Sequence, residues 1–373
     1  MFCACSGSSA VSEPDATTSP SPDAPSTIDR TPVEVDALGV QGFMLRRGHD
    51  VVLTAPLFTR QSAIDVTFNV PLVSDTAAID AKLAGEPLAD LRAIVTGHAH
   101  YDHFMDVPHV LERAPQAAVY TNLTGRHMLA ALAPDRPTCT NAPQSPSIAR
   151  DRVVALDDAL ASYVDYTNCP DQRPWGAPLE GQWLYVPNSN VRIMAFCSSH
   201  PAQIGPYHFG AGSIDQDQCT LPVAASGWLE GQTLALVIDF LDDHREPVFR
   251  VFYQDAPTNP PIGHVTPPVL AGKAVDLALL CVGSADAVED HPTNILANIT
   301  PRFALSGHWE DFFQPLDSAP QPIPLLDVAT YVQRAEAALP GSPDAPFVVD
   351  GAAATSRHVL VQPDSRFVVP LAP

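Results

Sequence analysis

The feature that most constrains this chain is a dense cluster of histidines and one aspartate directly after an apolar run. The run Leu91–Thr96 is typical of a buried central strand. After Gly97 it continues into His98–His103, which reads His-Ala-His-Tyr-Asp-His. With 13 histidines in 373 residues, unrelated surface histidines at a strand end are the alternative. The ordered His-x-His-x-Asp-His spacing argues against that alternative.

Imidazole nitrogens and carboxylate oxygens are ligands that suit zinc and the neighbouring transition metals. Because they occupy a single turn, His98, His100, Asp102 and His103 can converge on one or two ions. The sequence therefore predicts a metal centre at the carboxyl end of this strand.

The motif resembles the signature of the metallo-β-lactamase fold superfamily. The resemblance implies an α/β fold, an αββα four-layer sandwich of two mixed β-sheets flanked by helices. It also implies three further ligands, each after a later strand. The sequence supplies candidates in that order: His200 after Val191–Cys197, Asp255 after Val248–Tyr253, and His308 after Arg302–Leu305.

The resemblance further implies a two-metal site with a defined role for each candidate. Its ligands are His98, His100 and His200 for the first ion, Asp102, His103 and His308 for the second, and Asp255 as a bridge between them. Asp102 is also the candidate catalytic residue. The expected cofactors are two divalent ions, zinc in the first place, with iron or manganese as alternatives. Cys197 is an alternative ligand beside His200, and Asp255 could instead be a turn residue before Ala-Pro.

The implied activity is hydrolysis of an ester, lactone or phosphodiester bond in a small molecule or lipid, with a metal-bound hydroxide as the nucleophile. The lactonase-like and phospholipase-like branch of the superfamily resembles this chain best. The alternatives are a non-catalytic metal-binding or ligand-binding protein of the same fold and an iron-dependent oxygenase relative. The complete ligand set favours an enzyme.

The charge balance narrows the choice of partners. Lys and Arg number 20 against 42 Asp and Glu, which gives a formal net charge of -22. So acidic a chain repels phosphate backbones and anionic lipid surfaces, which argues against nucleic acid as a partner and against a nuclease of this fold. The expected partner is a small-molecule or lipid-like substrate, and the oligomeric state stays open.

The chain divides into a disordered N-terminal segment, 1–33, and a hydrolase domain, 34–373. The segment 6–33 consists mainly of Ser, Pro, Thr, Ala and Asp, a composition that buries too little to fold. Before it, Met-Phe-Cys-Ala-Cys-Ser resembles a bacterial lipoprotein cleavage site without the usual apolar region. Lipidation of Cys5 would tether the protein to the cell envelope through its N-terminus only; otherwise the protein is expected in the cytoplasm.

An irregular insert is expected over 133–190, where Pro, Asn and Gln are frequent. Long loops of this kind often form a lid or a substrate wall. Its aromatic residues, together with two from a later loop, could line an apolar wall beside the metals or could form the insert's own core. They are Trp175, Trp183, Tyr185, Tyr207 and Phe209. His208, between the last two, could touch substrate or lie exposed.

Cysteine usage leaves the pairing open. Cys139, Cys169 and Cys219 lie in loop-like sequence, where one or two disulfides would form in an exported protein. Cys281 lies in an apolar run and is predicted to be a buried core thiol.

Overall fold

The structure is a computed structural model that describes residues 29–159, 181–343 and 347–372. One compact unit begins at Thr31 and extends to the end of the described chain. The expected tether falls almost entirely outside the described residues, and Val33 already belongs to the first strand. None of the helices in the described ranges has the length and apolar character that a membrane crossing requires.

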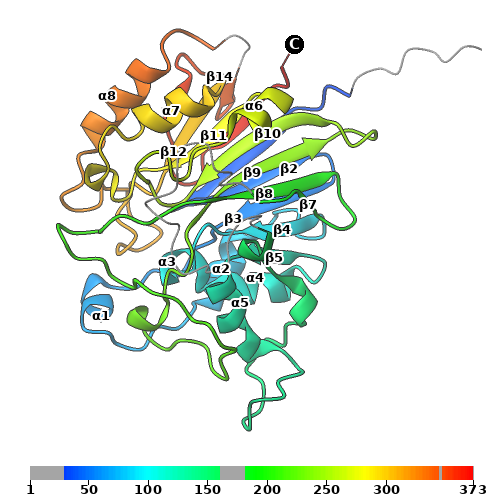
Figure 1. Ribbon diagram of the computed structural model, residues 1–373. Helices are drawn as coiled ribbons and strands as arrows, with labels where there is room; N and C mark the ends of the chain where they lie inside the picture. Colours follow the sequence, from blue (N-terminus) through cyan, green and yellow to red (C-terminus); the bar gives the residue numbers. More distant parts are fainter. Residues whose placement is uncertain (1–28, 160–180, 344–346, 373) are drawn as a thin grey trace, which may run out of the picture. The chain divides into compact units, whose positions relative to one another are not determined.

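Two mixed β-sheets form the centre of the compact unit (Figure 1). In the described residues the first has nine strands in the order β14-β13-β16-β1-β2-β3-β4-β5-β6. Its strands are β1 (Val33–Gly39), β2 (Gly42–Arg47), β3 (Asp50–Thr54), β4 (Leu91–Val95), β5 (Ala118–Thr121), β6 (Val153–Ala155), β13 (Val348–Val349), β14 (Ala352–Ala353) and β16 (Arg366–Val369). Strands β3 to β6 run parallel, whereas β2 pairs antiparallel with both β1 and β3.

The second sheet has seven strands in the order β15-β12-β11-β10-β9-β8-β7 within the described ranges. They are β7 (Leu184–Tyr185), β8 (Val191–Cys197), β9 (Leu234–Leu241), β10 (Pro247–Gln254), β11 (Leu277–Cys281), β12 (Phe303–Gly307) and β15 (His358–Leu360). β9 runs antiparallel to both β8 and β10, and β10, β11 and β12 are parallel. The carboxyl ends of β8, β10 and β12 therefore meet at one edge of the sheet.

Helices cover the outer face of each sheet. The helices of the described residues are α1 (Ala63–Thr67), α2 (Thr76–Lys82), α3 (Tyr101–Phe104), α4 (Val107–Arg113), α5 (Leu123–Leu129), α6 (Pro267–Gly272), α7 (Thr293–Ile299) and α8 (Val328–Ala338), of which α1 and α6 have no buried residue. In Figure 1, α2, α4 and α5 lie beside the strands of the first sheet, and α7 and α8 lie on the far side of the second.

Side-chain alternation along the strands separates the core into layers, because successive residues of a strand point to opposite faces. In β4, Ala93 and Val95 enter the cluster between the two sheets, whereas Ile94 packs with the helices on the outside. In β10, Val251 enters the cluster between the sheets and Phe252 packs toward α7 and α8. The predicted αββα four-layer sandwich is confirmed.

The stretch 133–190 is less irregular than the sequence suggested. β6 extends the parallel part of the first sheet, and β7 pairs with the edge of the second. Both strands have three residues or fewer, too short to give a period-2 pattern that would separate them from loop. Residues 160–180, with Trp175 and Cys169, lie outside the described residues.

A disulfide settles part of the cysteine question. Cys139, in the stretch after α5, is bonded to Cys219, in the long segment between β8 and β9. Cys197 at the end of β8 is also disulfide-bonded, so it is not a thiolate ligand. Cys281 is a free, buried thiol, as predicted.

Candidate metal centre

All seven predicted ligands follow the carboxyl ends of four strands. His98, His100, Asp102 and His103 come after β4 and on α3, and the other three follow β8, β10 and β12. Six of them form two groups whose candidate ligand atoms lie within 4.8 Å of one another. The groups are His98, His100 and His200, and Asp102, His103 and His308. Asp255 belongs to neither group.

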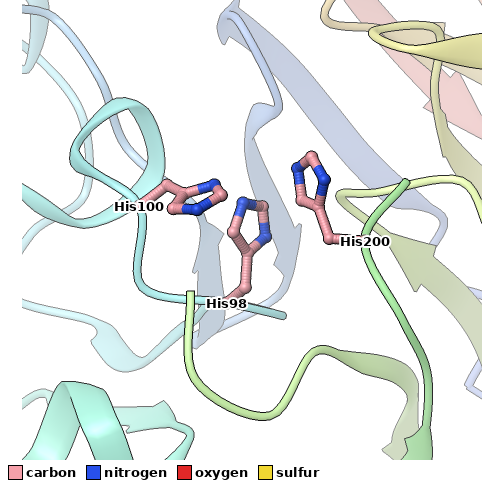
Figure 2. A group of neighbouring side chains, drawn as sticks. All are labelled: His98, His100 and His200. Atoms are coloured by element: carbon pink, nitrogen blue, oxygen red, sulfur yellow. The ribbon is translucent and has the colours of Figure 1, made fainter. Parts of the chain in front are cut away.

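The first group has three histidines from two distant parts of the chain. Figure 2 shows the rings of His98 and His100, from the loop after β4, and of His200, from the loop after β8, turned toward one another. The ring centroids of His98 lie 4.6 Å from His100 and 4.9 Å from His200. Convergence of this kind places one nitrogen of each ring around a common volume.

The opposite nitrogen of each ring is held by an oxygen acceptor. The contacts are His98 Nδ1 to Asp255 Oδ1 at 2.9 Å, His100 Nε2 to the Gly210 carbonyl at 3.2 Å, and His200 Nδ1 to the Pro201 carbonyl at 2.7 Å. Ligand histidines in metalloproteins characteristically donate their second N–H to such a carboxylate or carbonyl, which fixes the tautomer and the ring orientation. The remaining nitrogens are His98 Nε2, His100 Nδ1 and His200 Nε2.

The buried nitrogens of this group fit a metal ion. The ring of His98 is completely buried, and its Nε2 has no hydrogen-bond partner among the described residues. An unpaired buried polar atom costs about 1–3 kcal/mol, so this nitrogen requires a partner. A divalent cation among three imidazole nitrogens supplies one, and the donor set suits zinc or its neighbours.

The second group combines a carboxylate with two histidines. Asp102 Oδ2 lies 3.4 Å from His103 Nε2 and 3.3 Å from His308 Nε2. His103 also lies next to the first group, with its ring centroid 4.4 Å from that of His98. The two groups are therefore adjacent, as the two-metal hypothesis requires.

The backbone presents His308 in an unusual conformation. Its φ is 57°, in the left-handed region that residues with a side chain rarely adopt. Its N–H donates to the Val40 carbonyl at 2.6 Å, and Gly283 lies against the ring, where a Cβ would be 3.1 Å from Nδ1. Such backbone strain persists where the surroundings enforce it and is concentrated at functional sites.

The carboxylate of Asp255, predicted to bridge the two metal ions, contacts the first histidine of the motif and the backbone before it. It is buried, its Oδ1 pairs with His98 Nδ1, and its Oδ2 accepts the Gly97 N–H at 2.6 Å and the Tyr253 hydroxyl at 3.3 Å. A Cβ on Gly97 would lie 2.3 Å from Oδ1, so only glycine allows this approach. Oδ1 thus orients the first histidine of the motif while Oδ2 is held by Gly97 and Tyr253, and the bridging role stays a prediction.

Electrostatics give three of the candidate ligands the protonation state that a metal ligand needs, whereas Asp255 outweighs burial and raises the pKa of His98. Burial lowers the pKa of His100 to about 3, with a further contribution from His98, and burial also lowers the pKa of His103 to about 3. Burial opposes ionisation of Asp102, but His103 and His308 outweigh it and hold the pKa of that carboxyl well below its usual range. Neutral imidazoles and an ionised carboxylate are the forms that bind metals.

Sequence reasoning missed a third cluster beside the first group. His208 Nε2 lies 2.6 Å from Glu230 Oε2, and the His208 ring stacks on His200 with a centroid distance of 5.5 Å. Glu230 also lies 3.9 Å from His100 Nε2. A lone glutamate before Gly231 in a loop gives no sequence signal, because only the fold of the segment 198–232 brings it to the metal site.

The predicted aromatic wall is only partly in place. The guanidinium of Arg192 lies over the Trp183 ring, with the Arg192 Cζ 4.0 Å from the ring centroid. Arg245 lies over the Tyr185 ring in the same way, at 4.8 Å. Both aromatics are on or next to β7 at the sheet edge, where they cover arginines. Tyr207 and Phe209, in contrast, flank His208 in the segment that contacts the first group.

Comparison with known proteins agrees with this architecture. The model of the metallo-beta-lactamase superfamily matches residues 68–165, which include the metal motif. With its two mixed sheets and flanking helices, the chain has the metallo-β-lactamase fold, and this match confirms the resemblance predicted from the motif. No curated protein matches the sequence.

Solved structures with this fold are distant in sequence. Igni18, a metallo hydrolase from Ignicoccus hospitalis, is 12% identical with a TM-score of 0.43, over 90% of this chain and 97% of its own. A possible metal-dependent hydrolase from Veillonella parvula is 10% identical, with a TM-score of 0.45 over 90% of this chain and 98% of its own. CmlA, a diiron β-hydroxylase from Streptomyces venezuelae, is 10% identical, with a TM-score of 0.43 over 91% of this chain and 54% of its own. Likenesses this distant do not indicate a substrate or a metal.

Proposed function

We propose that this protein is a dinuclear metal-dependent hydrolase, with zinc as its metal, that cleaves an ester, lactone or phosphodiester bond. The observation that carries the proposal is the pairing of two adjacent ligand groups, each complete, at one edge of the fold. A non-catalytic relative would be expected to lack one or more of these side chains, and all six are in place among the described residues.

Each residue of the centre has a defined task. His98, His100 and His200 would hold the first ion, and Asp102, His103 and His308 the second. Two divalent ions held close together lower the pKa of water and stabilise negative charge that develops on an oxygen in the transition state. The ionised carboxylate of Asp102 places a negative charge in the second ligand group, and this charge attracts a cation to that group.

The cluster beside the first group can act on the substrate directly. His208 and Glu230 lie within hydrogen-bond distance of each other and next to His200. The side chain of His208 is 30% exposed, so its ring can reach a bound molecule, whereas His98 and His100 are buried and His200 is half-buried. We assign His208 to hydrogen bonding with the substrate and Glu230 to fixing its ring.

Elemental analysis combined with a hydrolysis screen tests the proposal. The purified protein should contain roughly two divalent ions per chain and should hydrolyse at least one member of a panel of lactones, carboxylic esters and phosphodiesters. His100→Ala should lose both metal and activity. The matched control is His49→Ala, because the His49 side chain is 93% exposed and remote from the motif in sequence; it should retain both.

The outcomes that would contradict the proposal are equally concrete. Hydrolysis that survives exhaustive chelation, or that survives His100→Ala, would show that the metal centre does not carry the reaction. Iron in place of zinc, together with oxygen consumption in the presence of a reductant, would assign the protein to the oxygenase alternative.

A further inference from the structure

Exposed apolar side chains are concentrated on two segments of the protein. Among the described residues, twelve large hydrophobic side chains are exposed, and eight of them lie within 61–75 or 198–232. Isolated exposed apolar residues are normal on protein surfaces, whereas a concentration marks an interaction site.

The first segment contains α1, a helix without any buried residue. A helix on a globular protein normally turns its apolar stripe toward the core. Here Ile64, Phe68 and Val73 are 68%, 76% and 75% exposed, and Val70 is 40% exposed. The apolar side chains of this segment therefore face solvent.

The second segment has an apolar tip over the first ligand group. Tyr207 and Phe209 are 64% and 56% exposed, and their rings stack with centroids 6.4 Å apart. Ile204, in the same turn, is 56% exposed. Between the two aromatics in sequence, the His208 ring contacts Glu230, with Nε2 2.6 Å from Oε2.

The two segments are joined to each other. The Leu72 N–H donates to the Val223 carbonyl at 2.7 Å, and the Ser226 N–H donates to Asn69 Oδ1 at 3.1 Å. Val223, at this junction, is itself 66% exposed. Figure 1 shows α1 and the green segment after β8 side by side near α3.

Both segments also contact the residues around the metal motif. The Ser74 hydroxyl donates to the Met105 carbonyl, directly after α3, at 3.0 Å. On the other segment, the Gly210 carbonyl contacts His100. The exposed apolar side chains thus lie on the two segments that flank the metal centre, and not at a random place on the fold.

The charges of these segments indicate what they can contact. Neither 61–75 nor 198–232 contains a Lys or Arg, and together they carry five acidic residues. Peripheral proteins that bind anionic lipids use clusters of basic residues, which are absent here. A surface with apolar side chains and only negative charge matches an uncharged or zwitterionic lipid surface, where Phe and Tyr insert at the headgroup level.

We propose that 61–75 and 198–232 form a docking surface for zwitterionic lipid, and that docking delivers a substrate with an apolar chain to the metal centre. The delivery step rests on the proposed hydrolase function, whereas the docking step does not. Tyr207 and Phe209 insert into the lipid while His208, between them, stays with the metal ligands.

Vesicle flotation with the full chain tests the docking step. Phosphatidylcholine vesicles should carry wild-type protein to the top of the gradient. Tyr207→Ser/Phe209→Ser should lower the partition coefficient by on the order of tenfold for each ring, because part of the apolar surface that each ring buries is lost. Leu325→Ser is the matched control, since Leu325 is 91% exposed but lies outside both segments; its partitioning should stay unchanged.

The two steps fail in distinguishable ways. His100→Ala should float as well as wild type, so loss of hydrolysis leaves the docking result intact. Equal flotation of the double variant and wild type, or binding to phosphatidylglycerol but not phosphatidylcholine vesicles, would overturn the docking proposal. A wild-type dimer in light scattering that the double variant converts to monomer, without any vesicle binding, would assign the surface to a second copy of the chain.

Discussion

Removing the disulfide between Cys139 and Cys219 is expected to destabilise the protein by about 4.5 kcal/mol at 25 °C. The two residues are 80 positions apart. In the chain-entropy model, closing a loop of about 80 residues removes about 15 cal/mol/K from the unfolded ensemble. Both cysteines are half-buried, so Cys139→Ser/Cys219→Ser adds no large cavity, and the change should come mainly from the unfolded state.

Urea denaturation of metal-free protein measures this effect, because bound ions would add a stabilisation of their own. The double variant should unfold at a clearly lower urea concentration than wild type. Since Cys219 lies on the segment that contains His200 and Gly210, the variant should also bind metal more weakly when metal is added back. A midpoint indistinguishable from wild type would refute the reasoning, because it would mean that this segment is fixed without the bond.

Three further predictions concern the metal centre and its surroundings. Gly210→Ala should lower metal content, since its Cβ would lie 2.8 Å from His100 Nε2, whereas Gly205→Ala, with a similar positive φ and open space, should not; elemental analysis compares them. Asp255→Asn should lower occupancy of both ions, and full retention of metal would remove Asp255 from the site. Burial lowers the pKa of His291 to about 4, so the unfolded chain takes up this proton first as the pH falls. His291 should therefore account for a loss of roughly 2 kcal/mol of stability between pH 7 and 4.5, so urea titrations at these two pH values should show a smaller drop in His291→Gln than in wild type.

The fold could be predicted from the sequence where strand patterns and metal ligands support each other. Val191–Cys197 was predicted as a strand with the bounds that the structure gives, because its apolar run is bounded by polar turns. The end of each such strand fixes where the next residues emerge. The resemblance to the superfamily implied that His200 and His308, each after a later strand, join the motif, and the structure brings both to it.

The parts that could not be predicted depend on contacts between distant loops. Glu230 and Gly210 reach the first ligand group only because the segment between β8 and β9 folds back over it, and no local pattern encodes that path. The pairing of Cys139 with Cys219 has the same origin, since spacing does not determine disulfide connectivity. For Asp255, the sequence indicates its place after β10 but not that its carboxylate turns to His98 and Gly97.

The segment 198–232 contributes both to the metal site and to the exposed apolar surface, and this double role restricts which substitutions the segment can accept. Its backbone carbonyls at Pro201 and Gly210 orient two of the three histidines of the first group, and the same turn presents Tyr207 and Phe209 to solvent. A substitution that alters the path of this turn therefore changes the ligand geometry together with the apolar surface. Its outward-pointing side chains can change without moving the metal ligands, whereas its backbone cannot. The disulfide at Cys219 fits this requirement, because it adds a covalent anchor to a long segment whose position must be held for the metal ligands.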